Sequence, residues 1–112
     1  MYKKGSFMVL LLFILVGCSN FTGKDALLKE VAEAEHLVND ENWEEVSGKI
    51  TTLNDLFYEH LWKIQLIGDE GEYERLHESI SRLFISIEEK DKAEAKLELA
   101  TIKALIQDIY SL

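Results

Sequence analysis

Apolar residues recur at intervals of three and four along almost the whole chain after residue 22, which is the spacing of one face of an α-helix. Short polar stretches interrupt this pattern, so it predicts four amphipathic helices, over residues 23–38, 43–67, 69–89 and from 91 onward. Because helices joined by such short turns fold back on one another, we predict an all-α protein, an antiparallel four-helix bundle of up-down-up-down topology. The alternative is a pair of helical hairpins that pack against partner molecules and not against each other.

The positions on the apolar faces predict the core of the bundle. They are Leu27, Val31, Ala34, Val38, Trp43, Val46, Ile50, Leu53, Phe57, Ile64, Ile67, Tyr73, Leu76, Ile80, Leu83, Ile87, Ala95, Leu99, Ile102, Ile106 and Ile109. We expect the ring of Trp43 to cover the end of the core between the first two helices. His60 is the only polar residue on the core face of the second helix, either as a hydrogen-bonded core histidine or as a pH-responsive residue or ligand.

Residues suited to cap helices stand at the predicted ends. Asn42, Asp69 and Asp91 are each followed three residues later by a glutamate, which predicts three N-terminal caps. Asn39 suits the left-handed conformation that often ends a helix. The second and fourth helices are also faintly similar at an offset of 49 residues, as in Ile50 and Leu99. Both a repeated helical hairpin and two unrelated amphipathic helices produce such a similarity.

Three apolar residues of the second helix lie off its core face: Tyr58, Trp62 and Leu66. One interpretation is that they pack against the ends of the first or third helix. The other is that they are exposed together as an apolar patch rimmed by acids, which commonly marks a surface for a partner.

The beginning of the chain has a different pattern, in which two lysines precede ten apolar residues, 7–16. This run is shorter than the roughly 20 residues of a membrane-spanning helix, and it is typical of a secretory signal peptide. It ends in a sequence of the bacterial lipobox form: Leu15, Val16, Gly17 and Cys18. We therefore predict a signal peptide over 1–17, a lipidated Cys18 with a short linker over 18–22, and a four-helix domain over 23–112. An ordinary cleaved signal and an uncleaved anchor are the alternatives.

This prediction places the protein on the extracytoplasmic face of the cell membrane, held in the bilayer by diacylglycerol and palmitate chains on Cys18. Two or more acyl chains give durable anchoring. As Cys18 is the only cysteine, no intramolecular disulfide can form and the fold depends on its apolar core. Without the two lysines of the signal, the chain has 10 basic and 21 acidic residues, a formal net charge of −11. This charge argues against binding to nucleic acid, which needs a basic surface.

The sequence offers little catalytic chemistry. It has no phosphate-binding glycine loop and no zinc-spaced cysteines, so we predict neither enzymatic activity nor a cofactor. Glu33 with His36 and Glu74 with His77 have the E-x-x-H spacing of di-iron carboxylate bundles. However, His36 lies nearly opposite the apolar face of its helix and the second pair lies at or beyond the edge of its own, so we predict no metal site.

Several short segments between residues 40 and 110 resemble the bacterial family of domain of unknown function 4363. They are the series Trp43, Val46, Ile50 and Leu53, the segments LWKI (61–64) and SISRL (79–83), and Asp91 before a leucine-rich last helix. The chain has Phe57 and Tyr58 where the family suggests a second tryptophan, and Asp69 and Glu70 where it suggests a histidine. The resemblance implies a small secreted or membrane-attached helical protein, common in Firmicutes, with no known activity. It also suggests a small multi-pass membrane protein as the partner.

Two classes of function remain. The first is a binding or scaffold module that contacts a membrane protein or another envelope component through Tyr58, Trp62 and Leu66. The second is a helical bundle that senses a ligand or a metal ion, using His60 and the acidic surface. A cavity in which His60 and carboxylates converge would favour the second.

Overall fold

The computed structural model describes residues 23–111, and within this range it contains helices and no strands. There are five helices, which confirms the predicted all-α class. They are α2 (Lys24–Asn39), α3 (Trp43–Glu59), α4 (Leu61–Ile67), α5 (Glu70–Glu88) and α6 (Lys92–Ile109). The predicted signal peptide and the lipobox residues Leu15, Val16, Gly17 and Cys18 lie outside the described residues.

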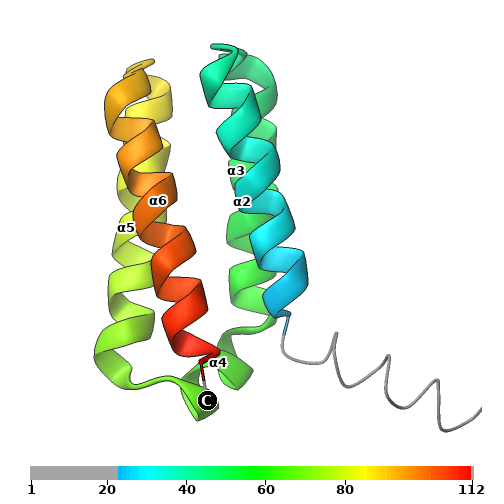
Figure 1. The fold of residues 1–112 in the computed structure, drawn as a ribbon, viewed down its shortest axis with the longest axis vertical. Helices are drawn as coiled ribbons and strands as arrows, with labels where there is room; N and C mark the ends of the chain where they lie inside the picture. Colours follow the sequence, from blue (N-terminus) through cyan, green and yellow to red (C-terminus); the bar gives the residue numbers. More distant parts are fainter. Residues whose placement is uncertain (1–22, 112) are drawn as a thin grey trace, which may run out of the picture.

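The helices form two hairpins that lie side by side. Figure 1 shows α2 beside α3 and α5 beside α6, with the short α4 between the two pairs at the lower end. The hairpins pack against each other, because α2 contacts α6 and α3 contacts α5. The beginning of α2 and the end of α6 lie at the same end as α4. We call this the α4 end of the domain; the turns within the two hairpins lie at the opposite end.

The two hairpin turns have the same backbone geometry. Glu41 and Lys90 have positive φ angles of 56° and 53°, and each is followed by the cap residue of the next helix. In the first turn Asn42 N donates to Leu37 O at 2.9 Å, and in the second Asp91 N donates to Ser86 O at 2.8 Å. The left-handed residue of the first turn is thus Glu41, and the prediction of Asn39 is wrong.

The predicted N-terminal caps are present. Asn42 accepts a hydrogen bond from Glu45 N, and Asp91 accepts one from Glu94 N at 3.1 Å. Asp69 and Glu72 form a reciprocal capping box, with distances of 2.7 Å and 3.3 Å. These caps satisfy backbone amides at the starts of α3, α5 and α6 that have no partner within their helices.

The second predicted helix is broken at His60, so the prediction of one continuous helix over 43–67 is wrong. The backbone of His60 has φ −99° and ψ 5°, and its amide closes α3 by donating to Leu56 O. Its carbonyl begins α4 by accepting from Ile64 N at 3.0 Å. The imidazole ring lies against Gly23, where an added Cβ would be 2.5 Å from His60 Cδ2. The break turns α4 under the bundle, so that Ile64 is fully buried in the core.

The core consists mainly of the predicted apolar positions, which are buried along all the helices. Three predicted core residues lie at its margin and are only partly buried: Trp43, Ile67 and Tyr73. Trp43 packs against the core from its margin and also lines a surface pocket with Phe84 and Ile87 near the end of α5. That its ring covers the core between the first two helices stays a prediction. Leu105 was not predicted and is buried.

Candidate functional site

An exposed apolar strip follows the end of α3 and the length of α4. It consists of Tyr58, Trp62 and Leu66, which are 51%, 54% and 75% exposed and which we call the α4 patch. Their spacing of four residues places them on one side of the chain, although the helix is broken between the first two. All three side chains are more exposed than buried, which favours the interpretation that they form an apolar patch together.

Beside the α4 patch is a surface pocket with a volume of about 260 Å³. It lies between the end of α3, the start of α4 and the first half of α5. Its lining residues are Phe57, Tyr58, Leu61, Tyr73, Glu74, His77 and Glu78. We call it the aromatic pocket, since four of these seven residues carry aromatic rings. Tyr58 belongs to both the pocket and the α4 patch, so the two features form one continuous surface.

The rings of the aromatic pocket contact one another across α3 and α5. His77 is stacked on Phe57, with ring centroids 6.0 Å apart and an interplanar angle of 22°. Tyr58 meets the ring of His77 edge-on, also at 6.0 Å, and Tyr58 Oη lies 3.5 Å from His77 Nδ1, at the long limit of a hydrogen bond. The buried Phe57 therefore supports a wall of partly exposed rings. Glu74 and Glu78 flank His77 along α5.

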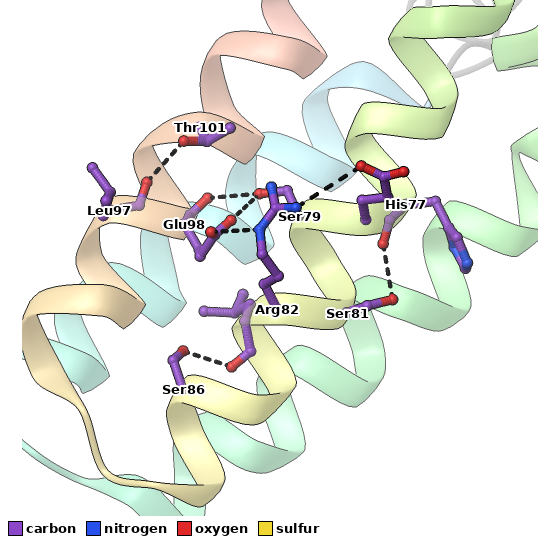
Figure 2. A network of polar contacts seen from close by, with 10 residues as sticks. His77, Ser79, Ser81, Arg82, Ser86, Leu97, Glu98 and Thr101 are labelled. Carbon is purple, nitrogen blue, oxygen red and sulfur yellow. Dashed lines mark hydrogen bonds and ion pairs between the residues drawn. The ribbon is translucent and has the colours of Figure 1, made fainter.

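A second polar cluster joins α5 to α6 on another side of α5. Its centre is Glu98, which is only 5% exposed. Figure 2 shows the Glu98 carboxylate between Ser79 and Arg82, while His77 points away from it. Ser79 Oγ donates to Glu98 Oε2 at 2.5 Å, and Arg82 Nε donates to Glu98 Oε1 at 2.8 Å.

Burial raises the pKa of Glu98, but the hydrogen bonds from Arg82 and Ser79 together lower it by a larger amount. The pKa of Glu98 therefore lies below its usual value. Both carboxylate oxygens are engaged, and we therefore regard this cluster as a link between two helices. Sequence reasoning missed Glu98. A signal was present, because Glu98 follows Ala95 and precedes Ile102 at the intervals of three and four that mark the buried face.

The E-x-x-H pairs do not form a metal site. Within residues 23–111, no group of three or more His, Cys, Asp or Glu side chains is placed to hold a metal ion. Glu33 instead pairs with Lys49, whose hydrogen bond lowers the pKa of Glu33, and His36 is exposed. His77 belongs to the aromatic pocket.

His60, at the junction of α3 and α4, does not line this pocket, and its ring lies against Gly23. Its Nδ1 is buried and has no hydrogen-bond partner in the part of the chain that the structure describes.

None of the helices within residues 23–111 has both the length and the apolar character that a membrane span requires.

Taken together, these features define a small, acidic, all-helical domain with an exposed aromatic surface at one end. The chain belongs to the family described as Domain of unknown function (DUF4363), whose model matches residues 22–112. This match confirms the resemblance seen in the sequence. Comparisons with curated proteins and with solved structures gave no significant match.

Proposed function

We propose that this protein is a lipoprotein of the extracytoplasmic membrane face, anchored through Cys18, and that it is a non-catalytic binding module for a membrane protein or another envelope component. The proposed scaffold is an antiparallel, up-down-up-down four-helix bundle in which α3 and α4 together form the second member. The observation that carries the proposal is the position of the α4 patch. It lies at the α4 end of the domain, where α2 also begins (Figure 1).

The connection between Cys18 and the domain is short. Gly23, the first described residue, contacts the ring of His60 at the junction of α3 and α4. Five residues of extended chain span at most about 18 Å, at 3.3–3.6 Å per residue. An acylated Cys18 at the bilayer surface would therefore hold Gly23 within about 18 Å of the lipid headgroups. Tyr58 and Trp62 are each two residues from His60, which lies against Gly23, so they would also be near the bilayer.

This position favours a partner that is itself in the membrane. The extracytoplasmic face of a membrane protein would be within reach of the α4 patch, whereas a partner free in solution has no need of a site so near the bilayer. The net charge of −11 for the chain from Cys18 onward opposes adsorption of the domain to anionic headgroups. Such repulsion keeps the patch accessible to a protein partner.

The anchor is tested by Cys18→Ala. We expect this variant to take up no labelled palmitate and to leave the membrane fraction or to remain unprocessed, whereas the parent is labelled and stays with the membrane. Labelling and fractionation like those of the parent would contradict the proposed anchor.

The binding surface is tested by photo-crosslinking from position 62 in native membranes. A matched control is position 97 on α6, because Leu97 is also a large apolar residue and is 61% exposed, but lies away from α4. We expect position 62 to capture a membrane protein that position 97 does not. Equal capture from both positions, or capture of lipid alone from position 62, would contradict the proposed protein partner.

A further inference from the structure

We infer that the aromatic pocket binds an arginine side chain from a basic segment of the partner polypeptide. This inference deepens the proposed binding function and rests on it, since it gives the partner a chemical class. Three features of the pocket suit an arginine: its rings, its carboxylates and its connection to the α4 patch.

The rings offer flat faces that suit a guanidinium group. His77 lies nearly parallel to Phe57, and Tyr58 closes one side at an interplanar angle of 74° to His77. Tyr73 lines the pocket from the first turns of α5. A guanidinium is planar and weakly hydrated, and it stacks on aromatic faces better than the compact ammonium of lysine.

The carboxylates supply the complementary charge. Glu74 and Glu78 both line the pocket, four residues apart on α5. Glu78 already lies 3.9 Å from the guanidinium of Arg82, in an exposed pair. Glu74 has no ion-pair partner within residues 23–111 and is exposed, so its carboxylate is available to an incoming cation. The pocket itself contains no lysine or arginine.

The connection to the α4 patch favours a polypeptide over a small organic cation. A pocket of about 260 Å³ accommodates the end of one side chain, and it is bordered by Tyr58, which is shared with the patch. When an arginine occupies the pocket, the residues next to it in the same segment lie over Trp62 and Leu66. The surface therefore fits an arginine flanked by apolar residues, in which the guanidinium gives specificity and the apolar neighbours add buried area.

The test uses the full chain in uncharged maltoside micelles and a dye-labelled peptide, acetyl-Ala-Leu-Arg-Leu-Ala-amide. Fluorescence anisotropy measures its affinity, with empty micelles as the blank. A second peptide has citrulline in place of arginine, which keeps the shape and removes the charge. We expect the citrulline peptide to bind at least tenfold more weakly. Citrulline binding within twofold of arginine would overturn the inference, and so would the absence of binding by both peptides.

Two variants locate the site. Glu74→Gln should weaken binding of the arginine peptide at least fivefold, whereas Glu45→Gln should leave it unchanged, because Glu45 is exposed in the first turn of α3, far from the pocket. Far-UV circular dichroism checks that both variants are folded. Equal affinities of the two variants would overturn the inference.

Tetramethylammonium, added as a competitor, distinguishes a small-cation site. Free N-acetyl-arginine amide is the reference competitor. If tetramethylammonium displaces the peptide at a concentration at which N-acetyl-arginine amide does not, the assignment to arginine is overturned. The outcomes remain separable from those of the proposed function. Capture of a membrane protein from position 62 together with failure of the arginine peptide contradicts only this inference, and palmitate labelling of Cys18→Ala contradicts only the anchor.

Discussion

The buried carboxylate of Glu98 gives a direct test of how α5 and α6 are held together. In Glu98→Gln the side chain keeps its volume but loses its charge, and its amide nitrogen faces one of the two donors, Ser79 or Arg82. A hydrogen bond to a charged group contributes about 1.5–3 kcal/mol when it is buried. The Arg82 side chain is 50% exposed and is solvated by water when its partner is lost. We therefore expect Glu98→Gln to lower the free energy of unfolding by about 1–2 kcal/mol, less than the loss of a fully buried hydrogen bond to a charged group.

The pH dependence of this loss is specific to a carboxylate. The pKa of Glu98 in the folded protein lies below its ordinary value of 4.5, because the hydrogen bonds from Arg82 and Ser79 outweigh burial. A carboxyl group whose pKa is lower when folded contributes stability that is fully present above its unfolded pKa and is lost as the pH falls through its folded pKa. The deficit of Glu98→Gln should therefore be complete at neutral pH and shrink below about pH 4.5.

Urea unfolding of the helical fragment 23–112, followed by far-UV circular dichroism at neutral pH and near pH 3, measures both effects. Glu74→Gln is the matched control, because its carboxylate is exposed and its loss should change stability by less than about 0.5 kcal/mol. A Glu98→Gln variant as stable as the parent, or one with the same deficit at both pH values, would refute the assigned role of Glu98.

The remaining predictions concern the stability of the domain. Trp43→Ala should lower the free energy of unfolding by about 2 kcal/mol, less than for a fully buried tryptophan, and Trp62→Ala by under about 1 kcal/mol, as measured by urea unfolding. Equal losses would contradict the partly buried and exposed positions of the two rings. Gly23→Ala should lower the melting temperature, because Gly23 has φ +78° and an added Cβ would be 2.5 Å from His60; an unchanged melting temperature would contradict this contact. A chelator should leave the melting temperature unchanged, and a large decrease would favour a metal-sensing function.

Most of the helical fold could be predicted because its signals are local. The three-four spacing of residues such as Leu27 and Val31 places them on a buried face, whatever the partner helix. Caps such as Asp69 with Glu72 depend on residues three apart. The capping residues and the apolar spacing therefore predicted the same helices.

The break at His60 could not be predicted from this spacing. The apolar positions continue at the same intervals through Phe57, His60 and Ile64, so a straight helix and a broken one have the same pattern. No proline marks the position. The segment around the break has contacts with distant parts of the chain, Gly23 against His60 and Gly68 near Ile109, which the local spacing does not encode. The spacing also did not reveal that Trp43 is only partly buried, since the exposure of a residue at the start of a helix depends on the neighbouring elements.

Three of the five large apolar side chains that are exposed among residues 23–111 lie at the junction between the two hairpins. The two hairpin turns have the same geometry, with Glu41 and Lys90 at equivalent positions 49 residues apart, which supports the faint repeat in the sequence. A short loop would be enough to join two such hairpins. The chain instead forms α4, whose Ile64 completes the core while Trp62 and Leu66 remain exposed. Exposed apolar side chains contribute little to folding, and they adjoin an aromatic pocket flanked by two glutamates. Exposed apolar residues beside such a pocket depart from the pattern of the fold, and residues that do so are commonly those that contact a partner.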